Sequence, residues 1–361
     1  MKSFSLGRYA LSLCAAASML TGCGGSQPPI GAPGAMPQNS ALATHADRAV
    51  FSNHRTASCP CIYVANRGNA RNTSSVTVYP IGANGNSKPI QDIQGSKTGL
   101  GRPHDVAVDA KGDIYVVNTA FWSVTVYAPG ATGDAKPIQT IRGRRTALAF
   151  PTGIATDSVN GDIYVLNNKT DSYGEGSITI YKRGATGNVK PAKVIEGLAT
   201  LLMWPNTLAL DASGNIYVTN RYNYITFYPA GSAGNASPTR IIAGSFTEMH
   251  LPTQVALDST LNVYVANYNG RSASVYAAGA DGNVAPIQAI HGGRTNIAGA
   301  FGAAVDADAD IYVANAYNNR FTALEGRITV YAAGANGDVR PIRTIEGDRT
   351  GLTFPTGLVI H

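Results

Sequence analysis

Side chains that commonly carry out catalysis are sparse in this sequence of 361 residues. It has six histidines and four cysteines, and it contains no Gly-x-Ser-x-Gly motif, no Cys/His dyad and no phosphate-binding loop. Only 14% of the residues are charged, and there is no basic run or RNA-binding motif. The formal charge of +6 includes the N-terminal Lys2 and Arg8, which leaves a mild +4 on the rest of the chain. We therefore expect no nucleic-acid partner.

Long apolar runs are also lacking, apart from Tyr9 to Leu20, which is too short to span a bilayer. Lys2 and Arg8 precede this run and Leu-Thr-Gly-Cys follows it, ending at Cys23. The arrangement predicts a signal peptide over residues 1–22. These last four residues resemble the bacterial lipobox, which implies that Cys23 is lipidated and anchors the exported protein to a membrane; an ordinary signal peptide is the alternative. Because Gly24 follows rather than Asp, the resemblance implies the outer membrane, facing the periplasm or the cell surface.

Residues 23–58 change in composition to Gly, Pro, Ser, Ala and Gln, which gives too little apolar bulk to fold alone. We interpret them as the lipidated cysteine and a flexible tether of about 30–35 Å root-mean-square length. The tether leads into a Cys-Pro-Cys sequence, Cys59 to Cys61. Residues two apart in an extended strand lie about 7 Å apart, so a bridge between them needs a tight turn. We interpret Cys59 and Cys61 as a structural pair, with a two-thiol metal or redox site as the alternative.

Residues 59–361 repeat one pattern six times. The copy over residues 150–197 reads as four short apolar, β-branched runs separated by Gly, Asn, Asp and Pro, which predicts four antiparallel strands joined by turns. Such a sheet cannot bury both faces alone, so the copies are expected to stack. The second strand recurs as Ile/Val-Tyr-Val and ends each time in an asparagine: Asn66, Asn118, Asn167, Asn220, Asn267 and Asn315.

The order of the copies predicts how the array closes. The strand at Cys61 lacks a first strand before it, and the last eight residues, Phe354 to His361, are a first strand with no second strand after them. The C-terminal strand should therefore pair with the N-terminal one, which removes the open sheet edges. The predicted fold is all-β: a six-bladed β-propeller of four-stranded antiparallel blades.

Strand direction sorts the loops onto two faces of the ring. We call the face where each first strand begins the upper face. The lower face repeats an aspartate in each first turn, which is expected to accept backbone N–H bonds: Asp109, Asp157, Asp211, Asp258 and Asp306. The asparagine that ends each second strand is expected to bond the backbone of a neighbouring loop.

The upper loops differ between copies, and loops on a rigid scaffold commonly carry function. Aromatic rings interleaved with arginine suit a glycan, peptide or protein partner; the alternative is that these side chains only cap the blades. The predicted ligand-binding residues are Arg67, Trp122, Tyr173, Tyr222, Tyr268, Tyr317 and Arg320.

The pattern P-x-G-[IV]-A-x-D-x-x-G-x-[IV]-Y-V resembles the NHL-repeat propellers over residues 61–361, with Asn where many NHL repeats have Asp after the second strand. That family includes extracellular sensor and binding domains, which implies recognition at the upper face.

Two enzyme groups on six-bladed propellers are more distantly similar. In the peptidylamidoglycolate lyases, zinc-binding histidines follow the proline that opens the first strand; here only His104 does, and one imidazole cannot form a three-histidine zinc site. Gluconolactonase-like enzymes use a Glu, two Asn and an Asp, of which Asn206 matches one, while Asp105 could partly replace the missing acid.

Two hypotheses follow from these patterns. The favoured one is a lipid-anchored binding or scaffold module of the cell envelope, without catalysis or cofactor, that recognises a glycan, peptide or protein. The alternative is a metal-dependent hydrolase or lyase of the lactonase or amidating type. Only this alternative requires a divalent metal, and its candidate residues are His104, Asp105 and Asn206.

Overall fold

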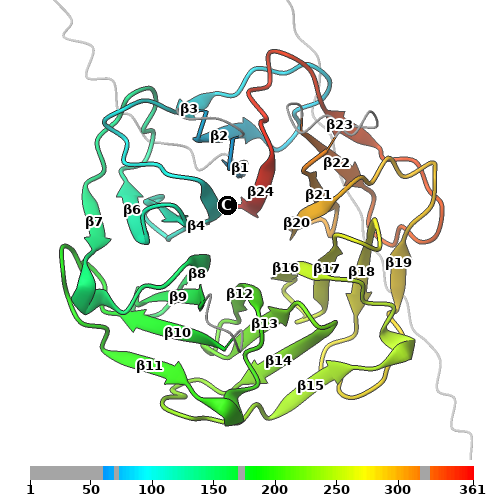
Figure 1. The fold of residues 1–361 in the computed structure, drawn as a ribbon. Helices are drawn as coiled ribbons and strands as arrows, with labels where there is room; N and C mark the ends of the chain where they lie inside the picture. Colours follow the sequence, from blue (N-terminus) through cyan, green and yellow to red (C-terminus); the bar gives the residue numbers. More distant parts are fainter. Residues whose placement is uncertain (1–59, 69–72, 170–174, 318–325) are drawn as a thin grey trace, which may run out of the picture. The chain divides into compact units, whose positions relative to one another are not determined.

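The computed structural model describes residues 60–68, 73–169, 175–317 and 326–361, which belong to one compact unit, Arg55–His361. They form six four-stranded antiparallel sheets arranged as blades around a central axis (Figure 1). The predicted six-bladed β-propeller is therefore confirmed.

From the axis outward, the first blade comprises β24 (Pro355–Ile360), β1 (Cys61–Asn66), β2 (Ser75–Pro80) and β3 (Gln91–Ile93). The second has β4 (Pro103–Val108), β5 (Ile114–Asn118), β6 (Ser123–Tyr127) and β7 (Gln139–Arg142). The third has β8 (Pro151–Thr156), β9 (Ile163–Asn168), β10 (Gly176–Tyr181) and β11 (Lys193–Glu196).

The fourth blade has β12 (Pro205–Leu210), β13 (Ile216–Asn220), β14 (Tyr224–Tyr228) and β15 (Arg240–Ala243). The fifth has β16 (Pro252–Leu257), β17 (Val263–Asn267), β18 (Ser272–Tyr276) and β19 (Gln288–Ile290), and the sixth has β20 (Ala300–Val305), β21 (Ile311–Asn315), β22 (Arg327–Tyr331) and β23 (Arg343–Ile345). The short 3-10 helices η1 (Arg144–Thr146), η2 (Leu198–Thr200) and η3 (Ser245–Thr247) follow β7, β11 and β15.

The apolar core lies between the blades rather than within any one of them. Each hydrophobic cluster draws side chains from two neighbouring blades, as where Val117 of β5 packs with Ile154 of β8 and Val165 of β9. The Ile/Val-Tyr-Val strands are buried on both faces for this reason. Burial of one such side chain contributes about 1.5–3 kcal/mol, so the stacked ring is stabilised mainly at its blade junctions.

The ring closes through β24 and β1, as the sequence predicts. Ile360 pairs with Ile62 and Leu358 with Val64 in an antiparallel register, and Figure 1 shows β24 (red) at the axis beside β1 (blue). Leu358 is also buried in the cluster that joins the sixth and first blades. The last strand thus supplies both a sheet partner and core packing.

Repeated polar contacts fasten the blades to their connecting loops. The Tyr331 hydroxyl donates to the carbonyl of Thr295 at 2.6 Å, and the corresponding tyrosine of every other blade bonds a loop threonine in the same way. Asn315 Oδ1 accepts from the loop amide of Ala298 at 2.9 Å, and its five counterparts do likewise. The expected role of these asparagines is confirmed.

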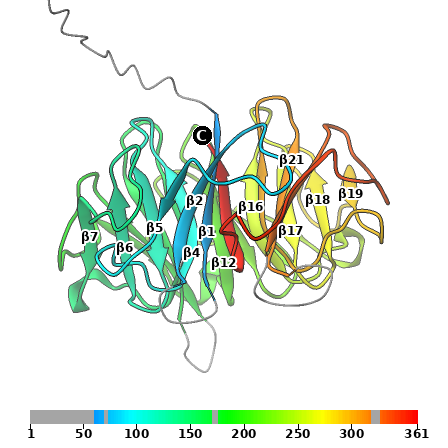
Figure 2. The same ribbon diagram turned by 90° about the horizontal axis from the view of Figure 1, so that it is seen from above.

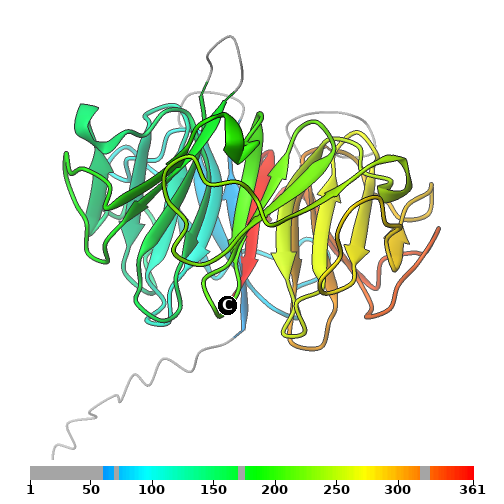
Figure 3. The ribbon, with the colours of Figure 1, turned by 90° about the horizontal axis from the view of Figure 1, so that it is seen from below.

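The two faces of the ring are distinct in the edge-on views. Figure 2 shows the strands β5, β6 and β7 of one blade side by side, and Figure 3 shows the upper face at the top and the chain end at the bottom. In a lower turn, Asp109 Oδ1 accepts from the amides of Lys111 at 2.9 Å and Asp113 at 3.0 Å, so this carboxylate closes its turn as predicted.

Candidate functional site

A belt of side chains joins neighbouring blades around the upper mouth of the channel. In five of the blades, the residue after the proline that opens the innermost strand bonds a carbonyl oxygen of the next blade. These bonds are His104 to Thr152 at 2.8 Å, Thr152 to Pro205 at 3.4 Å, Asn206 to Pro252 at 2.6 Å, Thr253 to Ala300 at 2.9 Å, and Thr356 to Pro103 at 3.3 Å. Five of the six blade junctions carry such a bond. Repetition of the bond indicates a structural role.

The sixth junction breaks the pattern because Phe301 of β20 has no polar atom to offer. Its ring instead packs against Phe354, with centroids 5.8 Å apart, and against Tyr268, with centroids 5.4 Å apart. Tyr317 completes the group, since its ring lies 5.6 Å from that of Phe354 and its hydroxyl accepts a 2.7 Å hydrogen bond from Tyr268. Arg67 lies over the Phe354 ring at 5.7 Å. We call Phe301, Phe354, Tyr268, Tyr317 and Arg67 the seam cluster.

The seam cluster combines aromatic surface with uncompensated positive charge. Burial and the nearby charge of Arg102 lower the pKa of the Arg67 guanidinium, while Tyr317 opposes the shift. No ion pair involves Arg67 or Arg102 among the described residues. All five members of the cluster are half-buried, so part of each side chain remains accessible to a ligand. An anion placed here would relieve the repulsion between the two guanidinium groups.

His104 borders the cluster, with its imidazole 5.6 Å from the Phe301 ring in an edge-to-face arrangement. Burial and the charge of Arg67 lower the pKa of His104 to about 4, against the raising effect of the Thr152 carbonyl. The imidazole is therefore neutral near pH 7. Because a carbonyl oxygen can only accept, Nδ1 carries the proton and Nε2 is left as an acceptor.

Large side chains adopt left-handed backbone conformations at the upper rim. The residue before each opening proline has a positive φ: 50° at Arg102, 51° at Phe150, 49° at Trp204, 54° at Leu251 and 53° at Phe354. This conformation costs an ordinary residue about 1–2 kcal/mol, and Gly or Asn is the usual choice. The sixth copy has Gly299, where a Cβ atom would lie 2.6 Å from the Tyr317 ring. Five bulky residues therefore share one left-handed backbone position at the upper rim.

The predicted ligand-binding residues do not form a single group. Arg67, Tyr268 and Tyr317 meet in the seam cluster, whereas Trp122 (49% exposed) belongs to the second blade and Tyr222 (62% exposed) to the fourth. Tyr173 and Arg320 lie outside the described residues. Cys61 is buried at the start of β1, and Cys59 lies outside the described residues, so their pairing stays a prediction.

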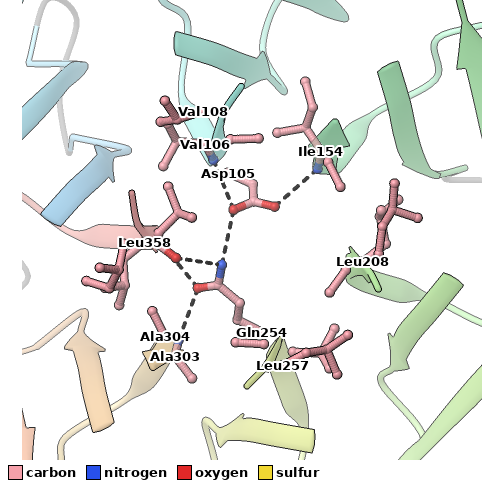
Figure 4. Close-up of a pocket in the computed structure, with 18 of the residues that line it drawn as sticks. Asp105, Val106, Val108, Ile154, Leu208, Gln254, Leu257, Ala303, Ala304 and Leu358 are labelled. Atoms are coloured by element: carbon pink, nitrogen blue, oxygen red, sulfur yellow. Dashed lines mark hydrogen bonds between the residues drawn. The ribbon is translucent and has the colours of Figure 1, made fainter. Parts of the chain in front are cut away.

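Directly below the belt, Asp105 and Gln254 meet across the channel (Figure 4). The Gln254 amide donates to Asp105 Oδ1 at 3.3 Å and to the Leu358 carbonyl at 3.1 Å, and its oxygen accepts from the amides of Ala303 and Leu358. Asp105 also accepts from the amides of Val106 at 2.9 Å and Ile154 at 3.1 Å. The two side chains, 2% and 6% exposed, thus link five blades through buried hydrogen bonds. Burial raises the pKa of Asp105 to about 7, against the two backbone bonds.

The residues of the enzyme alternative are engaged in these contacts. His104 and Asn206 belong to the belt, and Asp105 belongs to the cross-channel pair. Within the described ranges, no group of three His, Cys, Asp or Glu side chains is placed to hold a metal ion. The alternative activity stays a prediction for which these contacts offer no support.

Sequence reasoning missed Phe301, Phe354 and Gln254. Phe301 was detectable as the one apolar residue in a belt of His, Thr and Asn, and Phe354 shares its place before an opening proline with Phe150 and Trp204. Gln254 and Asp105 are 149 residues apart in the chain, so no local pattern could have paired them.

Comparisons with known proteins identify a fold and no family. No protein-family model matches the sequence, and no curated protein matches it. Among solved structures, 824 chains are similar, which marks the architecture as a common one. A protein of unknown function from Bacteroides caccae has a TM-score of 0.59 at 10% identity, covering 84% of this chain and 99% of its own. At that identity the likeness shows the fold alone, and the chain is a six-bladed β-propeller.

Proposed function

We propose that this protein is a lipid-anchored binding module of the cell envelope, whose seam cluster takes a saccharide that carries a carboxylate. The observation that carries this proposal is the interruption of the belt at Phe301. Five junctions use the position to fasten blades together, and the sixth uses it to build an aromatic surface beside Arg67. A departure confined to one copy of a repeat points to function rather than to folding.

The aromatic part of the cluster suits a sugar ring. Phe301, Phe354 and Tyr268 offer flat apolar faces on which the C–H face of a pyranose can pack. The hydroxyl pair of Tyr268 and Tyr317 can exchange hydrogen bonds with sugar hydroxyls. Burial and this hydrogen bond raise the pKa of the Tyr268 hydroxyl, so it stays protonated.

The charged part of the cluster supports an acidic sugar over a neutral one. A guanidinium binds a carboxylate through two parallel N–H bonds. Arg67 and the exposed Arg102 repel one another in the absence of a partner acid, and a carboxylate between them would be attracted to both. We therefore favour uronic-acid saccharides as the ligand class, ahead of peptides and proteins.

The anchoring half of the proposal rests on the N-terminal sequence. Residues 1–22 would direct export, Cys23 would carry the lipid, and residues 24–58 would tether the ring outside the outer membrane or in the periplasm. Among the described residues, no helix has the length and hydrophobicity that a membrane crossing requires. The resemblance to NHL repeats, which include extracellular binding domains, supports the same role.

The test compares one acidic and one neutral saccharide of matched shape. Calorimetric titration of the intact protein should show binding of digalacturonate and at least about tenfold weaker binding of galactobiose, which lacks the carboxylates. Arg67→Gln should remove that preference. Arg221→Gln is the matched control, because Arg221 lies 5.9 Å from the Trp204 ring in the fourth blade. Equal affinity for both sugars, or equal effects of both substitutions, would contradict the proposal.

A further inference from the structure

A cavity lies along the axis of the ring, below the Asp105–Gln254 pair and away from the seam cluster. Its volume is about 250 Å³. The wall is formed by the lower halves of the six innermost strands. Most of its side chains are aliphatic, including Val108, Leu208, Leu257 and Leu358, while polar atoms make up nearly half of the surface that faces the cavity. Figure 4 shows these side chains surrounding the two polar groups.

The upper end of the cavity is more buried than its lower end. Asp105 and Gln254 at its upper end are 2% and 6% exposed. At its lower end every innermost strand contributes a half-buried residue: Val108, Thr156, Leu210, Leu257, Val305 and Ile360. The lower face, opposite the seam cluster, is therefore the more accessible entrance to the cavity.

The size of the cavity restricts its occupant to a small molecule. Pockets for drug-sized ligands measure about 300–1,000 Å³, whereas an apolar cavity of about 150 Å³ can take up benzene. The 250 Å³ found here falls between these values. A short alkyl chain or a single ring fits, and its apolar surface would be buried against the aliphatic side chains of the wall.

The end of the cavity carries an uncompensated acid. Gln254 is fully used, because its amide donates both hydrogens and its oxygen accepts twice. Asp105 Oδ1 accepts from Val106 and Gln254, but Oδ2 accepts only from Ile154. One acceptor site on Oδ2 therefore remains within the described residues. No lysine or arginine pairs with this carboxylate there.

We propose that the lower channel binds a small hydrophobic amine, whose ammonium group pairs with Asp105 while its apolar part fills the aliphatic cavity. Burial raises the pKa of Asp105 to about 7, so the unpaired acid is partly protonated near neutral pH. An ammonium group would favour the charged carboxylate and supply a donor for Oδ2. An alcohol supplies only the donor, and a carboxylic acid adds a second negative charge. Charge complementarity thus selects the amine.

The test uses n-hexylammonium, hexan-1-ol and hexanoate as probes of equal chain length, titrated into the intact protein. Hexylammonium should bind at least about tenfold more tightly than hexanol, because hydrogen bonds to charged groups are the stronger ones. Hexanoate should bind weakest of the three. Equal affinities for amine and alcohol, or no binding of the amine, would overturn the proposal.

Two substitutions locate the binding. Asp105→Asn should abolish the preference for amine over alcohol. Val108→Trp should fill the cavity and abolish binding of all three probes without touching the polar pair, so it keeps the test decisive if the Asp105→Asn variant does not fold. Val159→Trp is the matched control, because Val159 is 82% exposed on the lower face outside the channel. Retained amine binding in Val108→Trp would place the site elsewhere.

Discussion

The ring of Phe301 packs against that of Phe354 across the junction of the sixth and first blades, with centroids 5.8 Å apart. At every other junction this position carries a side chain that hydrogen-bonds the next blade. One side of this junction is the first blade, which the two ends of the propeller domain complete by pairing β24 with β1. The apolar core between these two blades, which includes Leu358, offsets the loss of one polar link at the junction. The seam can therefore carry a binding surface without opening the ring.

Gln254 should be among the most sensitive polar residues of the ring. Gln254→Ala would remove one of the three donors to Asp105 and leave the backbone groups of Ala303 and Leu358 without the bonds that Gln254 makes to them. We expect the free energy of unfolding to fall by about 3–5 kcal/mol. Asn206→Ala is the control, since it removes one bond and should cost about 1 kcal/mol. Urea unfolding measures the loss of stability in both variants. Equal losses would contradict the role of Gln254 in linking the blades across the channel.

The two titrating groups at the channel mouth should act in opposite directions on stability. The pKa of Asp105 rises from 3.8 unfolded to about 7 folded, so its contribution is full below pH 4 and is lost as the pH rises through 7. The pKa of His104 falls from 6.5 to about 4, so its contribution is present above pH 6.5 and is lost as the pH falls through 4. Because the two contributions oppose one another, the free energy of unfolding of the wild-type protein should change little between pH 4 and pH 7.

Single substitutions should separate the two contributions. Of these two groups, Asp105→Asn leaves only His104 to titrate, so the free energy of unfolding should fall more steeply than in the wild type from pH 6.5 to pH 4. Of the same two groups, His104→Gln leaves only Asp105 to titrate, so the free energy of unfolding of this variant should rise from pH 7 to pH 4. Denaturant unfolding across this range measures both slopes. Slopes of the same sign in the two variants would show that burial does not shift these groups as described.

Removal of residues 352–361 should prevent stable folding, because β1 loses its partner strand and the sixth junction loses Leu352 and Leu358 from its core. His361→Ala is the control: the backbone bonds of this residue to Cys61 persist, so stability should change by no more than about 0.5 kcal/mol. Thermal unfolding of the truncated chain and of the His361→Ala variant provides the measurement. A truncated chain that melts like the wild type would refute closure by the C-terminal strand.

Lipidation at Cys23 predicts a membrane-bound protein that one substitution releases. Cys23→Ala should move the protein from the membrane fraction to the soluble fraction, since a covalent acyl group is the anchor. Cys14→Ala, within the predicted signal peptide, should leave the distribution unchanged. Cell fractionation with mass spectrometry of the N-terminus provides the measurement. Membrane retention of the Cys23→Ala protein would exclude this anchor.

The ring, its closure, the asparagine contacts and the Asp109 turn were predictable because each recurs along the chain, and repetition separates structural positions from variable ones. The seam cluster was only partly predictable. Tyr268 and Tyr317 lie in loops that vary between the copies, which marks them as candidates. Phe301 and Phe354 lie at the starts of strands, where the repeat indicates scaffold. The pairing of Asp105 with Gln254 depends on opposite walls of a closed ring, which sequence periodicity does not describe.

The central claim is that the interruption at Phe301 makes the binding surface, and Phe301→Thr tests it most directly. Threonine occupies three of the other five belt positions, at Thr152, Thr253 and Thr356, so the substitution should complete the belt and cost little stability. Titration with digalacturonate should show affinity reduced by about tenfold or more in a variant that remains folded. Wild-type affinity in folded Phe301→Thr would contradict the assignment of the site to the seam.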